Sequence, residues 1–534
     1  MSKYLAAICL SAVAMAATSS PAFARKLDFA ICDGLEAPKA KGDGMRPPAS
    51  SMFFSGPDAA AKVRSCTDAL ADPLLLPSQP VRRASLLRSR AVAHLAANAP
   101  DLALADVDAA LALSQPYLND PMFARTMGLS LQLVKAFAFQ QKGQGTTARA
   151  LALSAAARRP YSLEIQQLTS AILRNTAEAE AQTSPYLGLL PLQPQARNLQ
   201  FSWLFDQGRF GEAIRLFDQL DTEFPDPHAE LKTPQDFGSR SNRFMVSTMT
   251  SMQGAYAFAA SGRPDRAEKL VADVRKQMDA TTQPAGGILF GQSLETLKRA
   301  VDMWAELVQA RARLTPSTAI EIEKAVLHRS LPANAAGVEF LTALRKDLPE
   351  AERAHVPPPE AMMKLLATQR KPADIASLAR DLPDIEFSQD QAAYKKSNKS
   401  VIDVLGPAGY RRDGFRSRDD AATGLTTVEF VGNKATASAV DEMTLLYAAD
   451  LARQKGKTGF VIAARRDFTR TWNVTRGFDH VPVSSSPAGF KTELDIRFVD
   501  LNPSQAGGNP SSILDADKVY TDLAAIYIPA QPGG

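Results

Sequence analysis

The chain has 534 residues, 45% of them hydrophobic, and a formal net charge of +4 at pH 7. This charge balance is too small to indicate nucleic-acid binding. The length allows roughly two or three domains, and the apolar content is sufficient for each of them to form a core.

Residues 1–24 predict a secretory signal peptide. Lys3 makes a short basic start, residues 4–17 are apolar and uncharged, and Ala22 and Ala24 frame a cleavage site. A membrane anchor is the alternative, but the apolar run is shorter than the roughly 20 residues that a spanning helix needs. We therefore expect a periplasmic or secreted protein, cleaved near Ala24, with no membrane span in the mature chain.

Two cysteines, Cys32 and Cys66, follow the predicted cleavage site. An oxidising compartment favours a structural disulfide between them. Two free thiols are the main alternative, and a redox-active thiol is a weaker one because the CxxC spacing is missing. A bridge would tie residues 25–57, predicted as an irregular lead-in, to the first helix of the next domain.

Residues 58–368 have apolar positions at helical spacing, and they predict four helical hairpins. Their helices are expected at 85–97 and 102–113, 122–142 and 146–158, 195–207 and 210–223, and 243–261 and 264–280. A small residue follows each turn by five positions and allows two helices to approach closely. These residues are Ala103, Ala148, Ala213 and Ala267. One hairpin cannot bury its apolar side alone, so we expect the hairpins to stack. Further helices are expected at 162–180, 293–314, 317–329, 335–346 and 359–366.

After residue 400 the hydrophobic period changes from helical to alternating. Residues 369–400 predict a polar helical bridge, and residues 401–529 predict a small α/β domain. Its strands are expected at 426–431, 459–463 and 491–499, and its helices at 439–455 and 512–525. The predicted fold class is thus mainly α, followed by a small α/β domain.

Three hairpins repeat the same residue types at corresponding positions. These are Ala136, Phe139, Gly143, Ala148 and Pro160, then Leu204, Gly208, Ala213, Phe217 and Pro225, then Ala255, Phe258, Gly262 and Ala267. The pattern resembles the tetratricopeptide repeat, which implies an α-solenoid. Phe201 stands where that repeat has a small residue, the large aromatic at its fourth position is absent, and the spacing between repeats is longer. The array is therefore degenerate, and an irregular α-helical domain is the alternative.

The same resemblance implies a binding surface for a protein or peptide. Tetratricopeptide scaffolds bind through the first helix of each pair, which lines a concave face. Carried over by position, that face holds Leu133, Phe137, Gln140, Asn198, Ser202, Phe205, Met252 and Tyr256. The alternative is that the inserted helices cover it.

The C-terminal region has a second resemblance. A strand, a Gly-Asn turn and a helix with paired leucines are formed by Val428, Phe430, Gly432, Asn433, Thr436, Leu445, Leu446, Ala448, Ala449 and Leu451, followed by Gly456 and Phe460. This segment resembles a small domain of alphaproteobacterial envelope lipoproteins. The resemblance implies a place in the cell envelope and no known activity.

The sequence has few motifs that indicate a catalytic site. The five histidines are not at metal-ligand spacing from one another, and there is neither a Gly-x-Ser-x-Gly motif nor a phosphate-binding Gly loop. We expect no metal, no cofactor and no catalysis. A cluster of Arg465, Arg466, Arg470 and Arg476 could bind an anion, although a solvated loop is the more ordinary interpretation.

Two hypotheses for function follow. The first is a soluble envelope scaffold or adaptor that binds a protein or peptide partner. The second is an envelope enzyme, a hydrolase or a glycan-modifying protein, with its site in the C-terminal domain among Asp467, Glu493 and Asp495.

Overall fold

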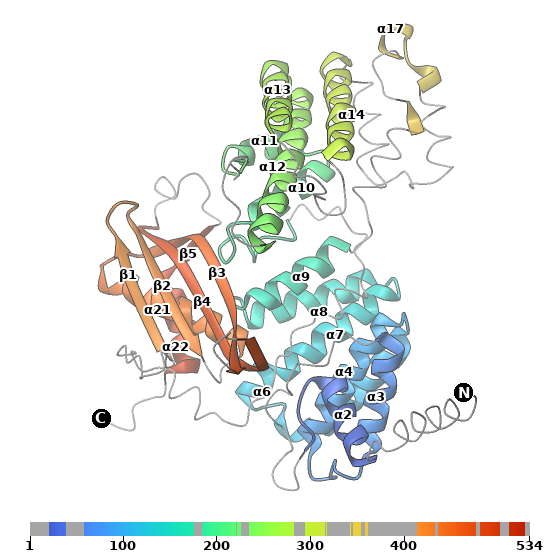
Figure 1. The fold of residues 1–534 in the computed structure, drawn as a ribbon, viewed down its shortest axis with the longest axis vertical. Helices are drawn as coiled ribbons and strands as arrows, with labels where there is room; N and C mark the ends of the chain where they lie inside the picture. Colours follow the sequence, from blue (N-terminus) through green and yellow to red (C-terminus); the bar gives the residue numbers. More distant parts are fainter. Residues whose placement is uncertain are drawn as a thin grey trace, which may run out of the picture. The chain divides into compact units, whose positions relative to one another are not determined.

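The structure is a computed structural model that describes residues 21–38, 58–175, 184–220, 222–225, 234–281, 294–315, 345–353, 414–432, 436–476, 481–501 and 512–528, with positions 317, 342 and 358–360. The chain divides into two compact units. Unit 1 combines Met1–Pro194 with Ala373–Gly534, and unit 2 is Gln195–Pro372. The described residues are mainly helical, and an antiparallel sheet lies near the C-terminus (Figure 1). None of the described helices combines the length and the apolar character that crossing a membrane requires.

The first half of unit 1 is a series of helices, which we call its helical part. They are α2 (Pro21–Asp33), α3 (Ala59–Ala71), α4 (Pro80–Ala96), α5 (Pro100–Leu113), α6 (Pro121–Arg125), α7 (Met127–Gln141), α8 (Gly145–Arg158) and α9 (Leu163–Asn175), with a 3-10 turn at Gln115–Tyr117. The pairs α4–α5 and α7–α8 are the first two predicted hairpins. Helix α5 also packs on α7, and α8 on α9, so each element contacts the next. Asn98 and Gly143 have positive φ at the turns, the left-handed conformation that ends a helix.

Helix α2 corrects the prediction of an irregular lead-in between residues 25 and 57. Its buried residues Phe29 and Cys32 lie three positions apart and face α3 and α4. Cys32 and Cys66 form a disulfide, with 2.11 Å between the sulfur atoms. The buried Arg82 side chain donates to Asp33 Oδ1 at 3.0 Å. Contacts with distant residues therefore hold this helix, and the local apolar pattern is too short to predict it. Residues 39–57 lie outside the described residues, as do residues 1–20 of the predicted signal peptide.

Unit 2 repeats the arrangement of consecutive packed helices. They are α10 (Ala196–Asp206), α11 (Phe210–Phe217), α12 (Pro234–Ala260), α13 (Pro264–Ala280), α14 (Leu294–Arg313) and the short α17 (Glu350–Arg353). Its core is rich in aromatic rings, and the Phe205 ring lies 5.7 Å from Tyr256 and 5.9 Å from Trp304. The predicted helices 317–329, 335–346 and 359–366 lie almost entirely outside the described residues, and the predicted bridge 369–400 lies wholly outside them.

The small residues predicted at the helix crossings are buried in both units. Ala103, Ala148, Ala213 and Ala267 are each 0% exposed. Because a methyl side chain keeps two helix backbones close, these positions account for the tight packing within each hairpin.

The second half of unit 1, its sheet part, contains β1 (Gly414–Asp420), β2 (Leu425–Gly432), α21 (Ala437–Gln454), β3 (Gly459–Arg476), β4 (Val481–Val499), β5 (Ile513–Asp515) and α22 (Ala516–Tyr527). All strand pairs are antiparallel, in the order β1-β2-β4-β3-β5. Helix α21 packs on β2, β3 and β4. Val428, Phe430, Leu494 and Ile496 alternate along β2 and β4 on the side that α21 covers, and all are 0% exposed.

Candidate functional site

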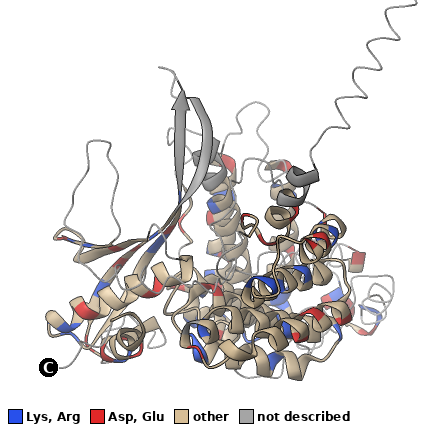
Figure 2. Cartoon of the chain, turned by 90° about the horizontal axis from the view of Figure 1, so that it is seen from below, with Lys and Arg blue, Asp and Glu red and all other residues tan. Residues whose placement is uncertain are grey.

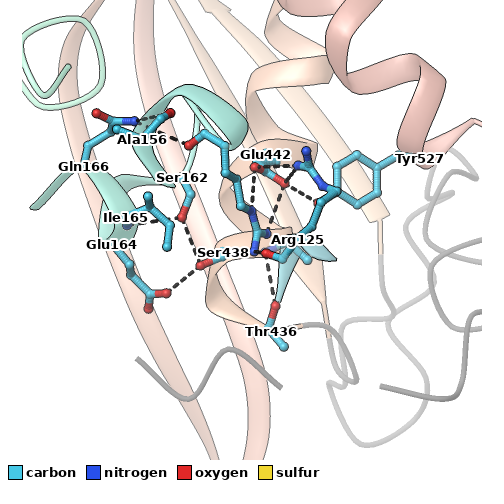
Figure 3. Close-up of polar contacts among 12 residues, drawn as sticks. Arg125, Ala156, Ser162, Glu164, Ile165, Gln166, Thr436, Ser438, Glu442 and Tyr527 are labelled. Atoms are coloured by element: carbon cyan, nitrogen blue, oxygen red, sulfur yellow. Dashed lines mark hydrogen bonds and ion pairs between the residues drawn. The ribbon is translucent and has the colours of Figure 1, made fainter. Parts of the chain in front are cut away.

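The sheet part of unit 1 meets its helical part at a polar junction (Figure 3). The first turn of α21 lies beside the start of α9. Thr436 caps α21 by accepting from the Ala439 amide at 3.3 Å. Where these two helix ends meet, Ser162 Oγ donates to Ser438 Oγ at 3.2 Å, and Ser438 Oγ donates to Glu164 Oε2 at 2.5 Å. A carboxylate near the N-terminal ends of two helices is favoured by their dipoles.

The centre of the junction is Glu442, whose side chain is 0% exposed. Arg125 Nη2 donates to both carboxylate oxygens at 3.0 and 2.9 Å. Arg159 donates from Nε and Nη2 at 2.9 and 3.1 Å, and the Tyr527 hydroxyl adds a further bond. Burial alone would raise the pKa of Glu442, but the charges of Arg159 and Arg125 outweigh it and lower that pKa. The buried carboxylate is therefore ionised at neutral pH.

The two arginines come from helix ends. Arg125 is the last residue of α6 and Arg159 is the C-cap of α8, and Arg159 Nη1 also donates to the Arg125 carbonyl at 3.1 Å. Cations near helix C-termini are favoured by the helix dipole. Glu442 belongs to α21 and Tyr527 is the last residue of α22. Four elements thus converge on one carboxylate, and the arrangement joins the two parts of unit 1.

A second contact joins the same two parts. The Tyr161 hydroxyl, from the turn between α8 and α9, donates to Asp522 Oδ2 on α22 at 3.0 Å. Burial and the bond to Asp522 raise the pKa of Tyr161, so its hydroxyl keeps its proton across the physiological range.

On the side of α21 that faces the sheet, Asp441 lies next to Arg465 and Asp467 of β3 and Thr492 of β4. Burial raises the pKa of Asp441 to about 7. The predictions from sequence did not single out Asp441 or Glu442. The available signal was a pair of acidic residues within the apolar run of residues 439–449, where charges are costly to bury without partners.

Two of the predicted anion-binding arginines, Arg465 and Arg466, face opposite sides of the sheet. Side chains alternate along β3, so Arg465 faces α21 and Arg466 faces the open side of the sheet. Arg465 pairs with Asp441 and Asp467, and Arg466 pairs with Glu493 and Asp495. The expectation of a shared anion site from Arg465 and Arg466 is therefore corrected, because neighbouring carboxylates already neutralise both. Arg470 lies further along β3, and the side chain of Arg476 lies outside the described residues.

Of the three carboxylates of the enzyme hypothesis, Asp467 is separated from Glu493 and Asp495, which share Arg466. Asp467 lies on the α21 side of the sheet, whereas Glu493 and Asp495 lie on the open side and bind Arg466 at 3.0 and 2.7 Å. Basic and acidic residues are interspersed over the helices and strands (Figure 2). Among the described residues, no group of three or more His, Cys, Asp or Glu is placed to hold a metal ion.

The predicted concave face is largely internal, which corrects that expectation. Leu133, Phe137, Gln140, Phe205, Met252 and Tyr256 are buried, and Asn198 and Ser202 are half-buried. The physical reason is that a later helix packs on each first helix. Helix α9 lies on α7, where Gln140 donates to the Ile172 carbonyl at 2.9 Å, and α14 lies on α12. These side chains form the core of each unit.

Unit 2 has a groove between two of its described helices. It has a volume of about 550 Å³ and lies between α13 and α14. Its apolar floor is formed by Val271, Ala272, Ala305 and Val308, and its rim by Glu268, Arg275, Lys276, Asp279 and Gln309. The groove therefore combines an apolar surface with charges of both signs.

Comparison with known proteins adds no relative. No protein-family model matches the chain, and neither a curated protein nor a solved structure matches it.

Proposed function

We propose that the chain is an exported, tetratricopeptide-like scaffold that binds a protein or peptide partner in the cell envelope. Both units support this proposal, since each is built from helical hairpins that pack one after another. The observation that carries it is the groove between α13 and α14, which has apolar residues at its base and charged residues at its rim. The occupant is an amphipathic segment of a partner protein, with apolar side chains on the floor and charged ones at the rim.

Charges on the rim favour such a segment over a purely apolar ligand. Glu268 and Asp279 are acidic, whereas Arg275 and Lys276 are basic, and all four are on α13. Arg275 also donates to Asp302 of α14 at 2.9 Å. A partner with charges of both signs beside its apolar residues would therefore pair with this rim and gain specificity.

Site-specific cross-linking tests the proposal. A photoreactive amino acid at Gln309, which lines the groove, should capture a protein of the envelope in living cells, to be identified by mass spectrometry. Ala272→Arg should reduce the captured amount at least about tenfold, because it fills the floor with a charge. Ala109→Arg is the matched control, an exposed alanine on a helix of unit 1, and it should leave capture unchanged. Capture that persists in Ala272→Arg would show that the groove is not the binding surface.

A further inference from the structure

Four polar side chains meet where α21 crosses β3 and β4. Asp441 comes from α21, Arg465 and Asp467 come from β3, and Thr492 comes from β4 opposite Asp467. Arg465 donates from Nε to Asp467 at 2.7 Å and from Nη2 to Asp441. The side chains of Arg465 and Asp441 are 3% and 7% exposed, so these two members of the cluster are screened from water.

The hydrogen bonds of Thr492 require an additional proton. Its hydroxyl oxygen lies 2.8 Å from Asp441 Oδ1 and 2.8 Å from Asp467 Oδ1. A threonine hydroxyl carries one hydrogen, so it can donate to only one of two carboxylates. Both contacts are full two-centre hydrogen bonds only if one carboxyl is protonated and donates to the hydroxyl oxygen, while the hydroxyl donates to the other.

Burial identifies which carboxyl holds the proton. The side chain of Asp441 is 7% exposed and that of Asp467 is 47% exposed, and desolvation favours the neutral form of the more buried acid. The pKa of Asp441 is raised to about 7, first by burial and then by the charges of Asp467 on β3 and Glu164 on α9. Arg465 and the bond from Thr492 act in the opposite direction.

We propose that Asp441 holds a proton shared with Asp467 through Thr492, and that loss of this proton loosens α21 in unit 1. When Asp441 ionises, two carboxylates compete for one hydroxyl hydrogen in a buried place. Helix α21 carries Glu442 as its next residue, and Glu442 binds Arg125 and Arg159 of the helical part. The proton on Asp441 is therefore linked to the docking of the sheet part on the helical part.

The direction of the change in folding stability with pH follows from the pKa of Asp441 in the folded and unfolded states. Asp441 has a higher pKa in the folded protein than in the unfolded chain, so the folded state binds more protons between these two values. Its stabilising contribution is complete below the ordinary value of 3.8, falls as the pH rises, and is lost once the pH passes about 7. Between pH 6 and 8 the folded state should lose about tenfold in its equilibrium constant from this group.

Hydrogen exchange and infrared spectroscopy of the full mature protein test the proposal. The amides of residues 437–454, corrected for intrinsic exchange, should lose about tenfold in protection from pH 6 to pH 8. Asp441→Asn should remove that loss. Asp495→Asn is the matched control because Asp495 lies on the open side of the sheet with a lowered pKa, and it should retain the loss.

A second measurement does not depend on the folding of a variant. The wild-type protein should show the infrared band of a protonated carboxyl at pH 6, and this band should disappear by pH 8. Thr492→Val, which removes the shared hydroxyl, should move the midpoint of that change. Absence of the wild-type band, or an equal loss of protection in Asp441→Asn, would overturn the proposal.

Discussion

Asp441 and Glu442 are neighbours on α21, yet their pKa values move in opposite directions. Burial raises the pKa of Asp441 to about 7, whereas the two arginines that reach Glu442 lower its pKa in spite of equal burial. Glu442 therefore stabilises the fold above the acid range, and its contribution is lost as the pH falls through its folded pKa. The contribution of Asp441 is complete below its ordinary pKa of 3.8, and it is lost as the pH rises from there through about 7. Together these two groups favour unit 1 most at acidic pH, near the ordinary pKa values of 3.8 for Asp441 and 4.5 for Glu442.

Glu442→Gln tests how much the charge of Glu442 stabilises the junction. The variant keeps the size of the side chain but leaves Arg125 and Arg159 buried beside a neutral group. Removing one partner of a buried ion pair costs about 3–5 kcal/mol, so unit 1 should lose stability by that amount. Urea unfolding followed by circular dichroism measures it. Glu212→Gln is the control, since Glu212 pairs with Arg209 at the surface and the change should cost under about 1 kcal/mol. Equal losses in the two variants would contradict the assignment of the junction.

The contact between α11 and α12 depends on a glycine, Gly254. A Cβ atom at Gly254 would lie 2.1 Å from the ring of Phe217, which is buried. Gly254→Ala should therefore lower the stability of unit 2 by about 1–3 kcal/mol through overpacking. Gly211→Ala is a matched control on α11, because nothing lies within 4 Å of its added atom. It should raise stability by about 0.5–1 kcal/mol, since alanine favours a helix over glycine. Thermal unfolding should move in opposite directions for the two variants.

The disulfide attaches α2 to α3. Cys32 and Cys66 are both 0% exposed and are 34 positions apart in the sequence. Cys66→Ser should cost about 2–4 kcal/mol, because the bridge restricts the unfolded chain. Reduced wild-type protein should show the same loss, measured by urea unfolding with and without reductant. Two reactive thiols in unreduced, denatured protein would show that the bridge does not form.

Much of the element structure follows from local patterns. The hairpin helices were predictable because apolar side chains at helical spacing and the turn residues Asn98, Gly143, Gly208 and Gly262 are close in sequence. Helix α2 was not, because distant residues such as Cys66 and Arg82 hold it. Strands β3 and β4 are longer than predicted, because charged residues beyond the apolar run are paired across strands, as in Arg466 with Glu493.

The candidate site was not predictable from sequence. Glu442 is 283 positions from Arg159 and 317 from Arg125, and no periodic pattern connects residues so far apart. The burial of the predicted concave face could not be predicted for the same reason, because it depends on contacts between helices that are distant in sequence. Resemblance to a repeat places residues on the first helix of each pair, but it does not say that α9 and α14 cover them. The period of a sequence predicts its elements, whereas contacts between distant elements decide which faces stay exposed.

Unit 1 is interrupted in the sequence by unit 2. Unit 1 takes its two parts from either side of unit 2 in the sequence, and the junction around Glu442 and the bond of Tyr161 to Asp522 join them. A protease site inserted between residues 373 and 413 should therefore leave the C-terminal fragment bound after cleavage. The two fragments should elute together in gel filtration at neutral pH. Cleaved Glu442→Ala protein should release the C-terminal fragment, because the change removes the hydrogen bonds from both arginines and leaves their charges buried. The uncleaved variant is the control for folding. If cleaved wild-type protein separates into two fragments, the junction does not hold unit 1 together.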